Sequence, residues 1–476
     1  MKKSFLWLMV LVISLTLLTS LVLSACKAEG ETTGSDTVEA TVAESIAGET
    51  TEVKSEESAS GEEIVLNMWW WGETEKPGLK EWLDETISLY KETHPNITIV
   101  PLLQNVDNLQ TAFRTAAAAK DPVVGPDIQF FWPGTYMMPD VWNGYVEPLN
   151  DLMPQEFFDE LKVLKEEIYD GKIWGVPWYA IQMPVCYNKT MFKNAGLDPE
   201  NPPKTWEEFL DACEKLKSSG VTPFGVGTKD GWFMAWWLND YGSQGFDSIG
   251  DLQNTFIEGN VDNSGIRAIF EPMYDLWNKG YCNESATSLA HYEGFELLKS
   301  EEVAMTICIF PDWIRDLGDE KIGIMRPPIH GTGKMAQTGE STGVSFQTMG
   351  ITTWSAHKQE AADFIMFMMS KERGEAQYNM SGAICARKDF DTSILKTQME
   401  KSLYNWTQEY PYVGNVECFI PEKIAYEGLY PAAQLIHSEN YTVDQCIEYL
   451  QNIVTEWKTL SPEQVENFTK WSEGLK

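Results

Sequence analysis

The fold is decided by residues 64–100, which read IVLNMWWWGETEKPGLKEWLDETISLYKETHPNITIV. The first six residues, 64–69, are apolar except for Asn67 and predict a short strand. A helix is predicted to open at Pro77, because apolar side chains then recur at helical spacing. The predicted inner face of this helix consists of Leu79, Trp82, Leu83, Ile87 and Tyr90. Pro95 ends the helix, and residues 97–100 are the next predicted strand.

The same alternation continues along the chain. Asp107 is a predicted cap for a second helix, and Asp127-Ile128 starts a third strand. This order of strands and helices is typical of an α/β lobe with a largely parallel sheet. Capping boxes at 205–208 and 442–445 predict two later helices, and residues 461–464 open the last one. The C-terminal third is therefore expected to be mainly helical.

The first residues have the features of an export signal. Lysines 2 and 3 precede an apolar run over residues 5–23, which ends in Leu23-Ser24-Ala25-Cys26. This pattern predicts a secretory signal peptide over residues 1–25. Its end resembles a bacterial lipobox, which implies that Cys26 carries lipid (palmitate) as the first mature residue. The alternative is an uncleaved membrane anchor, since the run is almost long enough to span a bilayer. Both alternatives place the rest of the chain outside the cytoplasm.

Residues 26–63 are interpreted as a disordered tether. Eleven acidic residues and many Thr, Ser, Ala and Gly occur there without an aromatic side chain. Such a segment cannot bury enough apolar surface to fold, and its charges repel one another. The formal net charge of the whole chain is -35. A charge of this sign argues against nucleic acid as a partner, and against charge-driven binding to an anionic membrane.

The remaining residues, 64–476, are too many for one ordinary core and indicate two lobes. Seven cysteines follow Cys26, without a CxxC motif. An odd number does not describe a disulfide framework, so we expect these side chains to be small buried hydrophobes. The five histidines lack metal-ligand spacing. We therefore expect neither a metal nor a cofactor.

A series of short motifs carries a family resemblance. The motifs are Trp-Trp-Trp-Gly-Glu at 69–73, Pro-Asp-Ile at 126–128, and the stretches 144–149, 170–177, 187–189, 192–196, 203–208, 302–305 and 360–362. Their order and spacing over residues 64–390 resemble the family-1 extracellular solute-binding proteins, the maltose-binding relatives of ABC importers. One departure concerns the Gly-Pro-Trp that commonly follows the Ala-Met strand. Residues 310–313 read Phe-Pro-Asp-Trp there.

The resemblance implies a two-lobe, type II periplasmic-binding-protein fold with hinge crossings and a ligand cleft between the lobes. The implied crossings lie near residues 180–184, 343–347 and 382–386. The implied lobes are 64–180 plus 345–383, and 184–343 plus 386–476. By the same resemblance, the chain would be a monomer on the outer face of the cytoplasmic membrane, held there only by its lipid. It would deliver its ligand to the permease subunits of an ABC importer and their ATPase.

A neutral sugar needs flat aromatic surfaces for its C–H faces and polar groups for its hydroxyls, because an unpaired buried hydroxyl costs about 1–3 kcal/mol. Ligands of open α/β sheets bind outside the carboxyl ends of the strands, where Trp71 and Trp132 are expected. Other predicted contacts are the aromatics Tyr179, Trp232, Phe233 and Trp313 and the polar residues Glu73, Gln104 and Asp312. The alternative for an aromatic residue is ordinary core packing, to which Trp69, Trp206 and Trp457 are assigned. The alternative for the polar residues is a solvated surface.

Two other functions remain open at this point. The first is a binding protein for a non-sugar solute, such as an amino acid, a peptide or a polyol phosphate. An anionic ligand would want an arginine cluster, and arginine is sparse near the candidate loops. A secreted glycoside hydrolase would need two carboxylates about 5–9.5 Å apart, and no motif singles out such a pair. The GxxxxGK[ST] motif of phosphate-binding enzymes is absent, and the single GxSxG string, at residues 339–343, follows no predicted strand. The leading hypothesis is therefore a carbohydrate-binding receptor without catalytic activity.

Overall fold

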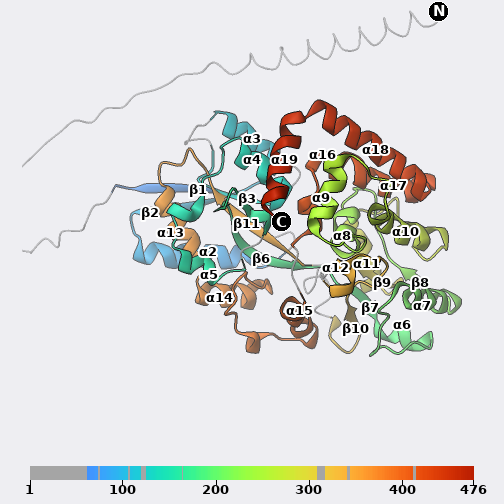
Figure 1. The fold of residues 1–476 in the computed structure, drawn as a ribbon. Helices are drawn as coiled ribbons and strands as arrows, with labels where there is room; N and C mark the ends of the chain where they lie inside the picture. Colours follow the sequence, from blue (N-terminus) through green and yellow to red (C-terminus); the bar gives the residue numbers. More distant parts are fainter. Residues whose placement is uncertain are drawn as a thin grey trace, which may run out of the picture. The chain divides into compact units, whose positions relative to one another are not determined.

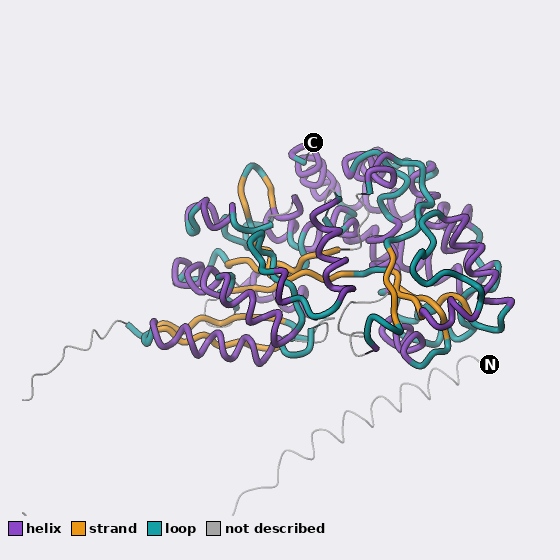
Figure 2. Tube along the Cα trace, turned by 90° about the horizontal axis from the view of Figure 1, so that it is seen from below, coloured by secondary structure: helices purple, strands orange, loops and turns teal. Residues whose placement is uncertain are grey.

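The computed structural model describes residues 62–72, 76–105, 108–119, 125–162, 165–307, 317–339, 344–410 and 414–475. The strands of these residues form two larger sheets and one small hairpin, and the larger sheets occupy separate places in the fold (Figures 1 and 2). Helices cover both sheets. The described part of the chain is thus a mixed α/β structure, as the sequence predicted.

The first sheet has five strands in the order β2-β1-β3-β11-β6. Their bounds are β1 Ile64–Trp70, β2 Ile97–Leu103, β3 Ile128–Phe131, β6 Val176–Gln182 and β11 Val344–Ile351. β1 pairs in parallel with β2 and β3, whereas β11 is antiparallel to both β3 and β6. The predicted parallel arrangement therefore holds for the first three strands. The sheet as a whole is mixed, because β11 returns to it from the opposite end.

The second sheet has four strands in the order β10-β7-β9-β8. Their bounds are β7 Val185–Asn188, β8 Thr222–Phe224, β9 Val303–Ile307 and β10 Ile322–Met325. β7 is antiparallel to β10 and β9, and β8 runs parallel to β9. The hairpin consists of β4 Ile168–Tyr169 and β5 Lys172–Ile173.

The helices follow the strands in chain order. The α-helices up to the last sheet strand are α2 Leu79–Thr93, α3 Leu109–Ala119, α4 Met138–Trp142, α5 Gln155–Asp159, α6 Lys189–Asn194, α7 Trp206–Ser218, α8 Phe233–Tyr241, α9 Ile249–Glu258, α10 Ser264–Asn278, α11 His291–Lys299 and α12 Lys334–Thr338. Those after it are α13 Lys358–Met368, α14 Lys371–Ser381, α15 Gln398–Glu409, α16 Glu422–Ile424, α17 Tyr430–Glu439, α18 Val443–Leu460 and α19 Pro462–Gly474. Short turns used below are η1 Gly134–Tyr136, η3 Lys165–Glu167, η6 Val416–Phe419 and the π-helical turn η7 Ala425–Leu429. The predicted helical character of the C-terminal third is confirmed.

The chain passes between the two sheets at a few points. β6 of the first sheet leads through residues 183–184 directly into β7 of the second sheet. β11 follows α12 and pairs again in the first sheet. Residues 384–386 then run beside β6, where the amide of Ala180 donates to the carbonyl of Ile384 at 2.8 Å. These points lie near residues 180–184, 343–347 and 382–386, where the family resemblance implied crossings. The crossings and the lobe boundaries stay a prediction.

The first predicted helix begins two residues later than expected. Gly78 precedes α2 with φ 93°, and a Cβ there would lie 2.5 Å from the carbonyl oxygen of Met380. This close contact in a left-handed conformation ends the turn before the helix. Leu79, Trp82, Leu83 and Tyr90 are buried as predicted, whereas Ile87 is only partly buried. Asp107 lies outside the described residues, and α3 begins at Leu109.

Two of the three predicted helix starts have their capping hydrogen bonds. At α7, the amide of Glu208 donates to Thr205 Oγ1 at 3.3 Å, and the amide of Thr205 donates to Glu208 Oε2 at 3.1 Å. Thr442 and Gln445 make the equivalent pair at α18. Ser461 precedes α19, but its side chain makes no capping hydrogen bond. The last helix, α19, begins at the predicted position.

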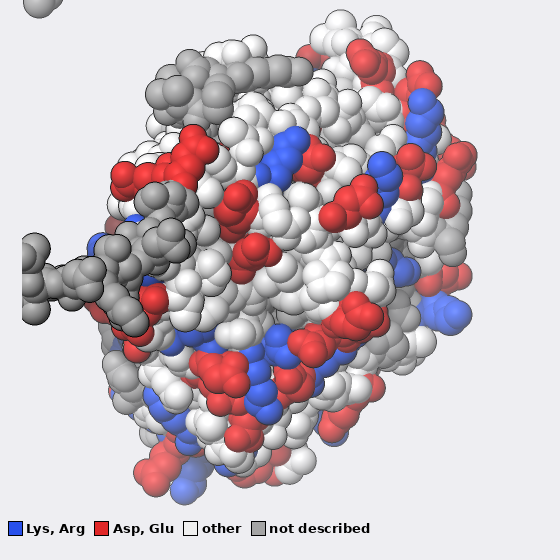
Figure 3. Space-filling model, turned by 90° about the vertical axis from the view of Figure 1, so that its left-hand side faces the viewer, with Lys and Arg blue, Asp and Glu red and all other residues white. Residues whose placement is uncertain are grey.

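Core and surface follow the predicted division of residues. Trp69, Trp206 and Trp457 are buried, as predicted for core residues. Five of the six cysteines among the described residues are buried and Cys282 is partly buried; all six are free thiols. On the face drawn in Figure 3, acidic and basic side chains are interspersed with uncharged ones. Among the described helices, none has the length and apolar character needed to cross a bilayer.

Candidate ligand-binding site

Two predicted tryptophans meet at the carboxyl ends of parallel strands. Trp71 follows β1 and Trp132 follows β3, and their ring centroids lie 6.0 Å apart. Phe130 contacts both rings, with centroids 6.0 Å from Trp71 and 5.7 Å from Trp132. Trp71 is 4% exposed and Trp132 is partly exposed. The structure therefore places these two rings together at the edge where the sequence predicted them, and Trp132 is the one that offers surface.

Gln104 lies at the same edge of the sheet. It follows β2, and its amide donates to the carbonyl of Trp70 at 2.7 Å. This bond continues the β1–β2 pairing, so the partly exposed Gln104 side chain belongs to the end of the strands. Glu73, Asp312 and Trp313 were also predicted as ligand contacts. All three lie outside the described residues.

Trp232 belongs to a second aromatic group, at the start of α8. Its backbone amide donates to Asp230 Oδ1 at 3.2 Å, which fixes the turn before the helix. Its ring lies 6.0 Å from that of Tyr426 and 5.9 Å from that of Tyr430. The rings of Tyr426 and Tyr430 are 5.2 Å apart. Trp232 and Tyr426 are partly exposed, which makes them available to a ligand.

Tyr136, which follows strand β3 of the first sheet, also belongs to this second aromatic group. It lies in η1, four residues beyond Trp132, and its ring is 5.6 Å from that of Tyr426. The sequence reasoning did not single out Tyr136, Tyr426 or Tyr430. A usable signal was present at residues 420–430, where Ile-Pro opens a helical segment and Tyr426 and Tyr430 fall one turn apart on the same face.

Two predicted contacts are core residues in this conformation. Tyr179 is 0% exposed in β6, with its ring 5.1 Å from that of Trp178. Phe233 is 2% exposed, with its ring 5.7 Å from that of Trp237. Phe233 is the first residue of α8, and the helix turns it inward while Trp232 remains at the surface. Neither offers surface here, and their contact with a ligand stays a prediction.

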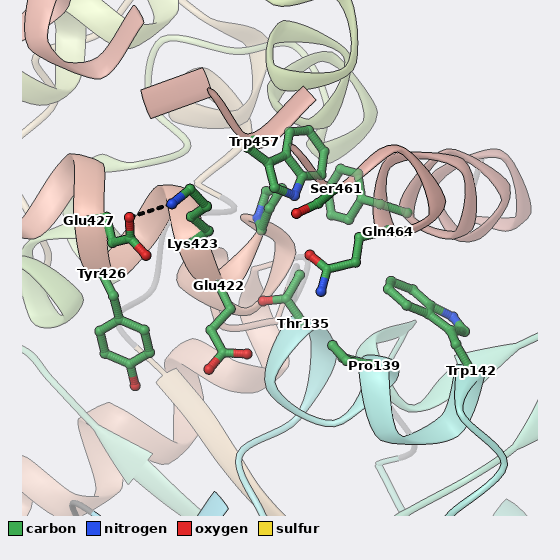
Figure 4. A pocket seen from close by; sticks show the side chains of 12 residues that line it. Thr135, Pro139, Trp142, Glu422, Lys423, Tyr426, Glu427, Trp457, Ser461 and Gln464 are labelled. Carbon is green, nitrogen blue, oxygen red and sulfur yellow. Dashed lines mark hydrogen bonds and ion pairs between the residues drawn. The ribbon is translucent and has the colours of Figure 1, made fainter. Parts of the chain in front are cut away.

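A pocket of about 280 Å³ adjoins the second aromatic group (Figure 4). α4 supplies Pro139 and Trp142 on one side, and the C-terminal segment supplies Glu422, Lys423 and Tyr426 on the other. The acidic and basic side chains that line this pocket are held in ion pairs. Lys423 Nζ contacts Glu427 at 2.5 Å and Glu456 at 3.0 Å.

An ion-pair network crosses the same place. Arg114 of α3 contacts Asp140 of α4 at 3.2 Å and Glu422 of α16 at 3.1 Å. Burial raises the pKa of Asp140 to about 6, against the opposing effect of the Arg114 charge. These pairs commit Arg114 and Lys423 to carboxylates. Among the described residues, no group of three or more His, Cys, Asp or Glu side chains is arranged to hold a metal ion.

The carboxylate of Glu417 holds two of the tyrosines. The hydroxyl of Tyr136 donates to Glu417 Oε1 at 2.5 Å, and the hydroxyl of Tyr430 donates to the same oxygen. Glu417 is 4% exposed, and burial raises its pKa to about 7, opposed by the hydrogen bond from Tyr136. Burial and the nearby Glu417 charge raise the pKa of Tyr136 and of Tyr426, so both phenols stay protonated at neutral pH.

Comparison with known proteins identifies the family. The family model described as bacterial extracellular solute-binding protein matches residues 70–375. An uncharacterized ABC transporter extracellular-binding protein of Pyrococcus horikoshii is 24% identical over 60% of this chain and 65% of its own length. The sn-glycerol-3-phosphate-binding periplasmic protein of Rhizobium meliloti is 28% identical over 33% of this chain and 38% of its own. These matches span at most about two thirds of either relative.

A solved structure gives the fold independently. A chitin oligosaccharide binding protein superposes with a TM-score of 0.68 at 20% identity, covering 83% of this chain and 99% of that one. A likeness at this identity establishes the two-lobe type II fold and no more. The family model, in contrast, matches well over half of the chain. The chain belongs to the bacterial extracellular solute-binding proteins.

Proposed function

We propose that the protein binds a neutral sugar or oligosaccharide outside the cytoplasm and delivers it to the permease of an ABC importer. The observation that carries this proposal is the pair of aromatic groups, Trp71 with Trp132 and Trp232 with Tyr426 and Tyr430. Trp132 at a strand end and Trp232 at the start of α8 are partly exposed, so they can stack on the apolar faces of a sugar. The chitin-oligosaccharide binding of a similar fold supports the same ligand class.

The proposed cleft includes further residues. Gln104 supplies an amide for hydroxyl groups, and Glu73, Asp312 and Trp313 remain proposed contacts outside the described residues. Tyr179 and Phe233 would act from behind the surface, or after a rearrangement that exposes them. The proposed lobes, 64–180 plus 345–383 and 184–343 plus 386–476, close on the ligand by rotation at the crossings. A ligand that contacts both lobes favours the closed form.

Two alternatives are less well supported. An anionic solute, suggested by the glycerol-phosphate-binding relative, would need a free cation. Arg114 and Lys423, two cations beside the pocket at the second aromatic group, are each shared by two carboxylates. A glycoside hydrolase would need a catalytic pair of carboxylates and would hydrolyse its sugar. The family to which this chain belongs is one of solute-binding proteins. We therefore propose a transport receptor that is not an enzyme.

A thermal-shift panel tests the ligand class. The domain without residues 1–61 is heated with chito-, xylo- and malto-oligosaccharides, monosaccharides, amino acids and sn-glycerol 3-phosphate. A sugar present at about 100 times its Kd should stabilise the native state by about 2.7 kcal/mol, which raises Tm by a few degrees. Stabilisation by glycerol phosphate alone would contradict the sugar assignment. Release of reducing sugar from an oligosaccharide would support the hydrolase instead.

Lipidation of Cys26 is a separate prediction. The Leu-Ser-Ala-Cys sequence at 23–26 predicts that the mature protein is anchored at the outer face of the membrane. Cys26→Ala should move the protein from the membrane fraction to the medium or the soluble extract, and mass spectrometry of the wild type should find a lipidated Cys26. An equally membrane-bound variant, with no lipid on the wild-type cysteine, would contradict the prediction.

A further inference from the structure

Glu417 is a buried acid without a basic partner among the described residues. It lies in η6, and both of its resolved side-chain donors are phenols, Tyr136 and Tyr430. Its backbone amide donates to Asn415 Oδ1 at 3.1 Å, which holds the turn. A carboxylate buried in this way is costly unless it is fully hydrogen-bonded or protonated. At 4% exposure, this arrangement of Glu417 depends on the two phenol hydrogen bonds or on a bound proton.

The two phenols reach Glu417 from different parts of the fold. Tyr136 follows β3 of the first sheet. Tyr430 begins α17, which packs on α8 and α10 beside the second sheet. The Tyr136 and Tyr430 rings also both border Tyr426, at 5.6 and 5.2 Å. The carboxylate thus joins the two sides and fixes the aromatic surface that includes Trp232.

We propose that Glu417 is a positioning residue that ties the two lobes through Tyr136 and Tyr430, and that gain or loss of its proton sets the strength of this tie. The two hydrogen bonds that form this tie do not involve a ligand. Any effect of the tie on ligand affinity rests on the proposed sugar-binding function, because the two tyrosines border the proposed stacking surface.

The charged surroundings determine the direction of the pH effect. η3 brings Glu166 and Glu167 near Cys418, the neighbour of Glu417, and η1, η7 and α17 bring the three tyrosines. α8 packs on η6, and burial raises the pKa of its Asp240 well above the usual value. η3 also carries a basic residue, Lys165, whose charge lowers the pKa of Glu166. No basic side chain of the described residues contributes to the pKa shift of Glu417, which is caused by burial and opposed by the Tyr136 hydrogen bond.

The tied arrangement therefore favours protonated Glu417. The usual pKa of the carboxyl is 4.5, and burial raises it to about 7 in the tied state. The tied state then holds a proton that a hydrated Glu417 would release between these two values. Its population relative to an untied, hydrated arrangement falls about tenfold for each pH unit across that window. The tie is strongest below pH 4.5 and reaches its weakest level above about pH 7.

A second acid contributes to the same interface. Glu166 Oε1 accepts from the amide of Asn415 at 3.2 Å, and burial raises the pKa of Glu166 to about 7. A Cβ on Gly414 would lie 2.4 Å from Glu166 Oε2, so the backbone of this turn closely covers the carboxyl group. A substitution at Glu417 should therefore remove only part of the pH dependence. Glu166→Gln measures the remainder.

The test uses the ligand-free protein without residues 1–61. Tm is measured from pH 5 to 8 for the wild type, Glu417→Gln and Tyr136→Phe. We expect the wild-type Tm to fall as pH rises, and the fall to be smaller in Glu417→Gln. Glu427→Gln is the matched control, because it removes an exposed carboxylate of the neighbouring turn; its pH profile should match the wild type.

Tyr136→Phe separates a proton-linked role from a structural one. The Tyr136 hydrogen bond lowers the pKa of Glu417, so its loss should move the midpoint of the pH profile to higher pH. An infrared band of protonated carboxyl that is lost in Glu417→Gln should titrate with the same midpoint. A Glu417→Gln profile identical to the wild type would overturn the proposal, and so would an unmoved midpoint in Tyr136→Phe. Should Glu417→Gln fail to fold, the Tyr136→Phe midpoint still decides.

The link to binding is measured with the best sugar from the thermal-shift panel. Affinity should be at least tenfold higher at pH 5.5 than at pH 8 in the wild type, with a smaller ratio in Glu417→Gln. An equal ratio in both proteins would overturn the link to binding. If no sugar binds at any pH while the ligand-free profiles follow the expectation, the proposed function fails and the tie stands.

Discussion

Trp178→Ala is expected to destabilise the protein by about 3–5 kcal/mol, as large-to-small changes at buried tryptophans do. Trp178 lies in β6 and is 0% exposed. Its ring is 5.9 Å from that of Trp82, 6.2 Å from that of Phe130 and 6.3 Å from that of Trp70. Its Nε1 has no hydrogen-bond partner among the described residues. The loss is therefore one of packing and of a cavity left behind.

Denaturant unfolding of the ligand-free domain measures this change through the midpoint concentration at constant slope. Trp406→Ala is the control, since Trp406 is a partly exposed ring of α15. Its substitution should cost less than about 1.5 kcal/mol. A Trp178→Ala loss below about 1 kcal/mol would show that the surrounding rings collapse into the space. Trp70 and Phe130 precede the proposed ligand contacts, so a weaker affinity in Trp178→Ala is expected as a secondary effect.

Local sequence patterns predicted those strands, helix faces and caps that depend only on residues close together in the chain. The strand at 64–69 and the helix face of Leu79, Trp82 and Tyr90 follow from hydrophobic periodicity alone. The caps at Thr205 and Thr442 follow from a side chain and a partner three residues later. The start of α2 was missed, because it depends on a contact of Gly78 with Met380, about 300 residues away. No local pattern reports such a contact.

The candidate site was predicted in part for the same reason. Trp71 and Trp132 were found because both follow strands, and the carboxyl ends of parallel strands share an edge. Tyr136 and Tyr430 were missed, because their meeting at Glu417 joins residues 281 and 13 positions apart along the chain. Phe233 was grouped with Trp232, although the first turn of α8 directs neighbouring side chains to different faces. Which of the two side chains faces the core could not be predicted until the first residue of the helix was known.

Trp232→Ala is expected to weaken sugar binding about 5- to 150-fold. The ring is partly exposed and is held by edge contacts with Tyr426 at 87° and with Tyr430 at 61°. Loss of one stacking surface costs about 1–3 kcal/mol for flat nucleobases, which is the nearest scale. Each 1.4 kcal/mol corresponds to a tenfold change in Kd. Trp132→Ala, which removes the exposed ring of the other group, should have an effect of the same order.

Isothermal titration calorimetry with the best sugar from the thermal-shift panel measures the loss. Trp277→Ala is the matched control, because Trp277 is also partly exposed but contacts Asn440 and His437 instead. Its affinity should equal that of the wild type. Tyr426→Phe keeps the ring and removes only the hydroxyl, so it should retain most of the affinity if stacking is the main contribution. A Trp232→Ala protein with unchanged affinity and a lowered Tm would assign this residue to the core, and the ligand would then contact other residues of the cleft.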